Sequence, residues 1–407
     1  MSHGSILSRS QRAPESGALW PSPDQELLLR AATLRGEPAL AAWRAWTSRH
    51  DLIESHLDRG SFRLLPLVYK NLVAHGIDEP HLPRLKGIYR YWWCSNQDLL
   101  YQAAGLVEHL EATGIRTLVL KGAALSAVHY RDMGVRPMAD VDVLVPFEQA
   151  HAASASLARI GWRPVKPWLE DEIRYRHSTP IVSRAGKEFD LHWHSLREGM
   201  RVDSDDRFWQ RSVPLPILHA RSRCLGATDA LLHAVVHGMR WNEEPAIRWI
   251  ADAMAILHSG HPIDWEALRE EAQARRVQLR LARGLEYLRR AFDAPLPSTA
   301  GRLVGAVRPS PIERLEFRYL GARSNPENRK RALQMGPMIA LEYLRVSSGR
   351  NLPRKITGLP GFLRYRLRGR HEPAVVVVRK VAHLLGLVPR RRGPQRPPIG
   401  PPALSSR

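Results

Sequence analysis

The sequence predicts an α+β fold in which a small mixed sheet lies between two helical regions. From Asp24 to about Gly114, and again beyond Ala227, apolar residues recur every three to four positions, which is the spacing of amphipathic helices. Between these stretches lie short runs rich in Val, Leu and Thr, bounded by turn signals, which is typical of strands. The expected order along the chain is therefore helices, sheet, helices.

Length and composition are those of a folded, soluble chain. The 407 residues suit two domains, or one domain with helical additions, and 44% of them are hydrophobic and 25% charged. No apolar run approaches the roughly 20 residues that cross a bilayer, and the N-terminus has no apolar segment of the signal-peptide type. Since only Cys94 and Cys224 could pair, we expect a cytoplasmic protein with reduced thiols.

Composition and periodicity divide the chain into five parts. They are a disordered leader (1–22), an N-terminal helical region (23–113), an α/β core (114–215), a C-terminal helical region (216–349) and a basic tail rich in Pro and Arg (350–407). In the N-terminal helical region, the neighbouring aromatic residues Tyr89, Tyr91, Trp92 and Trp93 could stack on bases. On a helix such residues more often pack in the core, which is what we expect here.

Most of the net charge of +21 sits in the tail. From Arg350 to Arg407 there are 14 Lys or Arg residues and one acid, Glu372, which leaves a net +13 in that segment. Such a segment is either solvated and partly disordered, or it attaches to a polyanion or a membrane surface. The apolar stretch Pro373–Pro389 is interrupted by basic residues, so it favours peripheral attachment over spanning.

The core region begins with a strand, a helix and a second strand. Two further strands follow, separated by a turn. The expected strands are 116–120, 141–145, 179–183 and 188–193, and the expected helix is 123–130.

Two carboxylates stand two residues apart on the second strand. Because side chains alternate along a strand, Asp140 and Asp142 share one face while Val141 and Val143 take the other. Two aspartates on one face repel each other unless a cation neutralises them, so the pattern suits a Mg²⁺ site. The alternative is a strand end with two solvated carboxylates.

The turn after the first strand is suited to phosphate. Lys121 and Gly122 follow that strand and open a helix, where backbone N–H groups cradle anions and a glycine lets a ligand approach closely. The alternative is a helix-start glycine beside an exposed lysine. Arg136, in the connection to the acidic strand, could reach a phosphate chain bidentately. Arg131 is its rival, and both could be surface residues.

A third carboxylate would complete a site for two metal ions. Asp190 is the candidate, because it lies on an alternating strand with His192 and His194 on its face, and Glu188 is the rival. The two histidines lack an obvious third ligand, so we expect them to contact base or phosphate, or to pack, rather than to bind a transition metal.

These motifs resemble the uncharacterised nucleotidyltransferases, a branch of the polymerase-β-like nucleotidyltransferase superfamily. The resemblance is close in the segments Leu120–Leu125, Tyr130–Pro146 and Phe189–Trp193. His233–His237 and Arg248–Asp252 also resemble the family's helical part, so the resemblance covers about residues 25–295 and excludes the basic tail. It implies a mixed sheet with helices on one side and transfer of a nucleoside monophosphate from an NTP.

The resemblance also implies roles for residues. Mg²⁺ or Mn²⁺ would be held by Asp140 and Asp142, with Asp190 as the third position. Ala123 stands where the wider superfamily usually has serine, so backbone N–H groups, with Lys121, Gly122 and Arg136, would have to hold the phosphates.

Several alternatives stay open at this point. The acceptor could be a small molecule, a protein side chain or an RNA end, and the chain could instead be a non-catalytic nucleotide- or RNA-binding protein on the same fold. His233 and His237 share a helix face, where packing or substrate contact is favoured over zinc. Arg248 and Asp252 form either a surface ion pair or a link between the helical region and the active site.

Overall fold

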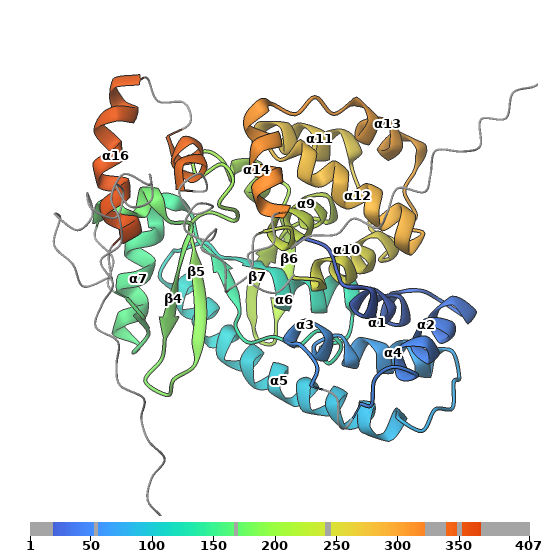
Figure 1. Cartoon of the computed structure of the whole chain (residues 1–407). Helices are drawn as coiled ribbons and strands as arrows, with labels where there is room; N and C mark the ends of the chain where they lie inside the picture. Colours follow the sequence, from blue (N-terminus) through green and yellow to red (C-terminus); the bar gives the residue numbers. More distant parts are fainter. Residues whose placement is uncertain are drawn as a thin grey trace, which may run out of the picture.

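The computed structural model describes residues 19–52, 56–166, 170–240, 246–321, 339–347 and 352–367. These residues build a seven-stranded mixed sheet with the strand order β3-β4-β5-β2-β1-β7-β6, and helical regions flank it as expected (Figure 1). The strands are β1 (Leu118–Leu120), β2 (Asp142–Leu144), β3 (Arg163–Pro164), β4 (Ser178–Val182), β5 (Glu188–His192), β6 (Val213–Ile217) and β7 (Ala220–Cys224).

The register of the three central strands determines where the acidic residues lie. β1 runs antiparallel to β2 with Leu120 opposite Asp142, and β2 runs parallel to β5 with Asp142 opposite Asp190. Residues opposite each other on neighbouring strands point to the same face. The pairing therefore brings Asp142 and Asp190 together, although 47 other residues separate them in the sequence.

The hairpin of β6 and β7 was not expected from the sequence. Pro214 and Pro216 lie in β6, which is an edge strand, where a missing N–H breaks no ladder. The turn between the strands contains Leu218 with a φ of 53° and no glycine, so the usual hairpin signal is absent. Because β7 pairs with β1, the sheet extends past residue 215 to Cys224.

The N-terminal region is helical, as predicted. Its helices are α1 (Pro23–Thr33), α2 (Glu37–Thr47), α3 (Arg59–Phe62), α4 (Leu65–Ala74) and α5 (Leu82–Ala112). Ser22 and Gln25 cap α1 reciprocally, and Asp58 caps α3. Leu19 and Trp20, which fall within the leader expected at 1–22, are buried in the hydrophobic core, and residues 1–18 lie outside the described residues.

Shorter helical segments connect the strands. They are α6 (Lys121–Leu125), a π-helical turn η1 (Ser126–Tyr130), η2 (Phe147–Gln149), α7 (Ala150–Arg159), η3 (Glu170–Tyr175) and α8 (Asp206–Gln210). The C-terminal region contains α9 (Ala227–Gly238), α10 (Arg248–His258), α11 (Trp265–Ala274), α12 (Gln278–Phe292), α13 (Ser298–Ala306), α14 (Pro311–Gly321) and α16 (Leu352–Leu367). Residues 368–407, with the apolar stretch 373–389, lie outside the described residues.

Helices cover both faces of the sheet, not one. On one face, Val119, Val143 and Leu191 pack against α5 and α7. On the other, Leu118, Leu120 and Leu144 join a core formed by the N-terminal helices with α9, α10 and α12. Because β1 is apolar on both faces, both need a cover. In Figure 1 the blue helix α1 lies beside α10.

The aromatic cluster on α5 is not core, contrary to the sequence prediction. Tyr91 and Trp93 are exposed, at 64% and 44% of their surface. Tyr89 is half-buried, and its hydroxyl donates to Asp132 at 2.9 Å.

The two cysteines are unpaired, with Cys94 exposed and Cys224 buried in β7. No helix within the described residues is both long and apolar enough to cross a membrane.

Candidate active site

The site lies where β1 ends and β2 begins, on the sheet face that the C-terminal helices cover. Lys121 directly follows β1, and its Nζ donates to Asp142 Oδ1 at 2.5 Å. The backbone of Lys121 is left-handed, with a φ of 47°, a conformation that is uncommon for residues other than glycine and that clusters at functional sites. The turn between strand and helix thus aims the ammonium at the acidic strand.

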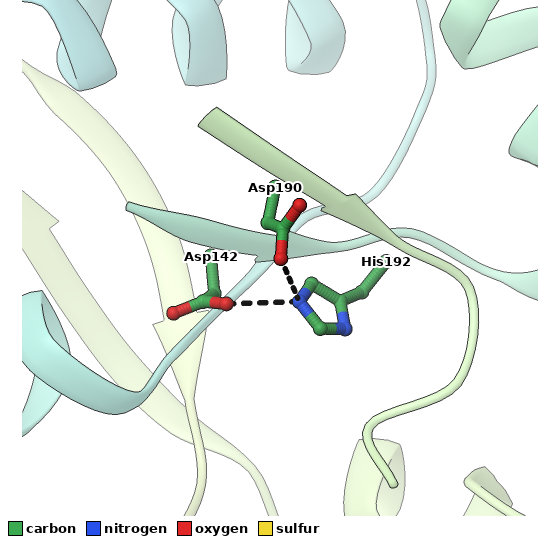
Figure 2. Close-up of side chains that lie close together, drawn as sticks. All are labelled: Asp142, Asp190 and His192. Atoms are coloured by element: carbon green, nitrogen blue, oxygen red, sulfur yellow. Dashed lines mark hydrogen bonds and ion pairs between the residues drawn. The ribbon is translucent and has the colours of Figure 1, made fainter. Parts of the chain in front are cut away.

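His192 joins the carboxylates from the end of β5. Its Nε2 lies 2.9 Å from Asp142 Oδ1 and 3.7 Å from Asp190 Oδ2, and Figure 2 shows both interactions meeting at this one ring nitrogen. His192 and Asp142 are buried, whereas the side chain of Asp190 is 26% exposed. His194, expected beside them, instead faces Asp205, whose Oδ2 lies 3.2 Å from its Nδ1.

The electrostatics of this cluster follow from its partners. Burial opposes ionisation of Asp142, but Lys121 and His192 hold the pKa of its carboxyl well below the usual range. Burial and Lys121 likewise oppose a charge on His192, yet hydrogen bonds to Asp142 and Asp190 raise the pKa of its imidazole. Asp142 is thus ionised in a setting already supplied with positive charge.

Asp140 stands apart from that cluster. It is exposed and lines a large cavity, next to Asp142. Desolvation by the surrounding protein and the charge of Asp142 raise the pKa of Asp140 above its ordinary value. Of the three carboxylates expected to hold metal, the structure therefore brings Asp142 and Asp190 together with His192, and Asp140 is outside this group although it lines the cavity with Asp142.

The cavity has a volume of about 810 Å³ and a wall rich in cations. Among the described residues that line it, the cations are Arg59, Arg63, Lys121, Arg136 and Arg248 and the carboxylates are Asp140, Asp142 and Asp252. Five cations against three carboxylates leave an excess of positive charge in these walls. A volume of this size suits a nucleotide-sized ligand.

Three of these arginines have no ion-pair partner within the described residues, and the sequence analysis missed two of them. Arg59 begins α3 and Arg63 is the cap residue at its C-terminus, and their spacing cannot be told from an ordinary solvated helix face. Arg248 begins α10, and its Nη1 donates to the carbonyl of Pro137 at 2.7 Å. Burial and the charge of Arg136 lower the pKa of Arg248 to about 9. An arginine held this way favours an incoming anion.

Arg136, expected to bind phosphate, is committed to a protein partner. Its Nε and Nη2 each donate to one oxygen of Asp252 at 2.8 Å, and both side chains are buried. Tyr130 also donates to Asp252, at 3.0 Å. Asp252 on α10 therefore pairs with Arg136, in the segment that leads to Asp140 and Asp142. Together with the contact of Arg248 to Pro137, this pair links α10 to the candidate active site. Such a link was one of the two alternatives for Arg248 and Asp252.

Protein side chains pack closely against Gly122 and Ala123, where the sequence predicts contact with a phosphate group. A Cβ on Gly122 would lie 2.6 Å from Arg136 Nη1 and 2.8 Å from Met138 Sδ, so the missing side chain makes room for these groups. Ala123 is buried in the core and does not line the cavity. The first N–H groups of α6 have no side-chain cap, which leaves them available to an anion.

The two histidines of α9 line the cavity as neutral groups. Their rings stack with centroids 5.5 Å apart, and the Nε2 of His233 lies 3.0 Å from the carbonyl of Ser195. Burial and the charge of Lys121 lower the pKa of His233 to about 3 and that of His237 well below its ordinary range. The ring stacking and the contact of His233 with the Ser195 carbonyl are packing contacts.

The donor set near Asp142 fits a divalent cation. Ligand atoms of Asp142, Asp190 and His192 all lie within 4.8 Å of one another, and two carboxylates with an imidazole are common metal donors. Lys121 already neutralises Asp142 where a cation would do so. The site therefore offers the ligands, and an ion bound there would take the place of the Lys121 ammonium at Asp142.

No curated protein matches the chain. The family model for uncharacterised nucleotidyltransferases matches residues 61–293, which is more than half of the chain and contains β1 to β7 with α9, α10 and α12. This chain belongs to the uncharacterised nucleotidyltransferase family.

Proposed function

We propose that the chain moves a nucleoside monophosphate from a nucleoside triphosphate to a nucleophile on an acceptor and releases pyrophosphate. The observation that carries the proposal is the cavity in which Asp140 and Asp142 share the wall with arginines that no carboxylate of the described residues neutralises. Carboxylates suit a divalent ion, and arginines suit a phosphate chain. One cavity thus supplies both halves of a metal–nucleotide site.

The triphosphate would lie along the cationic side of the cavity. Lys121 and the N–H group of Gly122 would bind it from the sheet, and Ala123, which does not line the cavity, would not contact it. Arg63 would reach it from the N-terminal helices and Arg248 from the C-terminal helices. Arg136 would act chiefly by fixing α10 through Asp252, with its Nη1 beside Gly122. Helical regions on both sides of the sheet would then hold the same ligand.

The carboxylates would organise the transfer. The acceptor's nucleophile forms a bond to the α-phosphorus while the bond from that phosphorus to the β-phosphate oxygen breaks, and the electron pair leaves with pyrophosphate. A Mg²⁺ or Mn²⁺ held by Asp140, Asp142 and Asp190 would neutralise the charge that develops on the phosphates. Asp190 takes either the third ligand position or the proton of the acceptor.

Thermal unfolding with each of the four NTPs and with Mg²⁺ or Mn²⁺ tests this proposal without knowledge of the acceptor. A ligand that binds only the folded state stabilises it, by about 2.7 kcal/mol at 100 times its Kd. We expect one nucleotide to raise the melting temperature of the wild type when metal is present. The double variant Asp140→Asn, Asp142→Asn should lose this shift.

A matched variant controls for nonspecific effects. Asp203→Asn removes an exposed carboxylate that does not line the cavity and should keep the full shift. If no nucleotide stabilises the wild type, the transferase proposal fails. If nucleotides bind equally well to the double variant, the alternative of a non-catalytic nucleotide-binding protein becomes the better one.

We also propose that the chain consists of two helical regions, an α/β core and a basic tail. The tail would contact a polyanion or a membrane surface. α16 packs against Tyr175 through Phe362, so the tail is attached to the core at least as far as this helix. Binding of RNA through the residues after 367 should weaken steeply as salt rises and should be lost when they are deleted.

A further inference from the structure

His192 has a position that the proposed transfer does not yet explain. It ends β5, is fully buried and lies two residues after Asp190 on the same strand. The parallel pairing of β2 with β5 brings its Nε2 to 2.9 Å from Asp142 Oδ1, while Asp190 Oδ2 is 3.7 Å away. Figure 2 shows the ring nitrogen facing both carboxylates.

The other ring nitrogen determines which atom carries hydrogen. Nδ1 of His192 lies 3.2 Å from the carbonyl oxygen of His194, and a carbonyl only accepts, so Nδ1 is the donor. Nε2 then faces two carboxylate oxygens. Either a proton on Nε2 or a metal ion among the three atoms satisfies this geometry, because the carboxylates would repel a bare lone pair. Histidine ligands of metals are held in the same way, with the second N–H donated to a carbonyl or carboxylate.

The spacing of these atoms fits a shared ion. Ligands at about 2.1 Å from a six-coordinate ion are roughly 3 Å apart when adjacent. The two distances from His192 Nε2, 2.9 and 3.7 Å, are close to this spacing, and all three side chains offer ligand atoms within 4.8 Å of one another. Lys121 shares Asp142 Oδ1, and its flexible side chain can turn toward phosphate when an ion takes that oxygen.

We infer that His192 is the nitrogen ligand of a divalent metal ion that it binds together with Asp142 and Asp190, and that this site prefers a first-row transition ion such as Mn²⁺ to Mg²⁺. The preference follows because imidazole suits transition ions, whereas Mg²⁺ favours oxygen ligands. The inference rests on the proposed function. Of the two roles proposed for Asp190, it makes this residue a metal ligand and not the group that takes the proton of the acceptor. His194 cannot be the nitrogen ligand, since its ring faces Asp205.

Electron paramagnetic resonance of the full chain with Mn²⁺ alone tests this assignment without an activity measurement. The continuous-wave signal of free Mn²⁺ gives the affinity, and pulsed spectra report nitrogen bound to the ion. We expect the wild type to show ¹⁴N modulation that changes to the ¹⁵N pattern when only histidine is ¹⁵N-labelled. This labelling needs no variant, so it is independent of any folding defect.

Variants identify which histidine is responsible. His192→Gln keeps an amide that can hydrogen-bond to Asp142 but removes the nitrogen ligand, so it should abolish the modulation and weaken Mn²⁺ on the order of 10- to 100-fold. Mg²⁺ affinity should change much less. His261→Gln, at an exposed histidine outside the cavity lining, should behave like the wild type.

Two results would overturn the inference, and they differ in what else they remove. Mn²⁺ that binds the wild type without histidine nitrogen coupling leaves the proposed function standing and reduces His192 to a group that orients Asp142. Failure of the wild type to bind Mn²⁺ at all removes both the assignment and the metal requirement of the proposed transfer.

Discussion

Gly122 illustrates at the residue scale how the site is packed. A Cβ there would meet Arg136 Nη1 at 2.6 Å, and Arg136 cannot easily move because Asp252 holds it through two hydrogen bonds. The fold thus needs this glycine even without a ligand. From the sequence motif alone, one would conclude that Gly122 is there to let a ligand approach the backbone.

We expect Gly122→Ala to lower the free energy of unfolding by about 1–3 kcal/mol, because the added methyl group overpacks the contact with Arg136 and Met138. Urea unfolding measures this loss. Gly87→Ala is the matched control, since Gly87 lies within α5 with no atom near its would-be Cβ. That change should stabilise by roughly 0.5–1 kcal/mol. Stabilisation by both substitutions would contradict the crowding described here.

At the scale of elements, α10 is tied to the acidic segment by charge. Asp252 pairs with Arg136, and Arg248 donates to the carbonyl of Pro137, so one helix contacts the connection to β2 at two points. The connection carries Asp140 and leads directly into Asp142. The position of α10 therefore influences the position of both carboxylates.

Asp252→Asn should cost about 3–5 kcal/mol of stability, because it leaves the buried charge of Arg136 without its partner. The double variant Arg136→Met, Asp252→Leu should be more stable than this single variant, since no unpaired charge remains. Chemical unfolding of the wild type, Arg136→Met, Asp252→Leu and the double variant gives the coupling free energy. Asp203→Asn, which breaks an exposed pair with Arg201, should change stability by less than about 0.5 kcal/mol. If the two substitutions have simply additive costs, the link is weaker than its geometry implies.

At the scale of the whole molecule, the two helical regions share one core. Trp20, ahead of α1, packs against Trp249 of α10 and Tyr287 of α12, with ring centroids 6.4 and 4.7 Å away. Buried ion pairs reinforce the C-terminal side, where Glu198 bonds to Arg240 and Arg280. Regions that are far apart in sequence are therefore expected to unfold together.

Acid should weaken the whole fold, beginning near pH 6.5. Burial and the nearby His261 lower the pKa of His129 from 6.5 to about 4, so between these values the unfolded chain binds a proton that the folded chain does not. His129 then contributes a loss of about 1.4 kcal/mol per pH unit as pH falls through this window, in addition to the losses from His177, His233 and His237, whose pKa values burial also lowers. Glu198 adds a second loss below its ordinary pKa of 4.5, because Arg280 and Arg240 overcome its burial and hold its folded pKa well below that.

Urea unfolding at pH 7.5, 5.5 and 4.5 measures this dependence. His129→Gln cannot titrate, so its stability should fall less steeply than that of the wild type between pH 6.5 and 4.5. A variant with the same slope as the wild type would show that His129 does not contribute. Below pH 4.5 both proteins should weaken in parallel, since Glu198 is unchanged.

Much of this protein follows from local sequence. Periodicity of apolar residues predicts the helical regions and the central strands, because each element needs an apolar face to bury. The pattern Asp-Val-Asp after a strand–turn–helix predicts an acidic site next to Lys121, since these residues are neighbours along the chain or on one strand. Those predictions concern distances that the backbone geometry of a single element already determines.

Only the tertiary structure decided the rest. The pairing of β2 with β5 places His192 against Asp142, the packing of α3 brings Arg59 and Arg63 to the cavity, and the approach of α10 gives Arg136 to Asp252. The hairpin of β6 and β7 is held by pairing with β1 rather than by a turn signal. Each of these contacts joins residues far apart in the chain, so it depends on how elements pack, which the local pattern of one sequence does not determine.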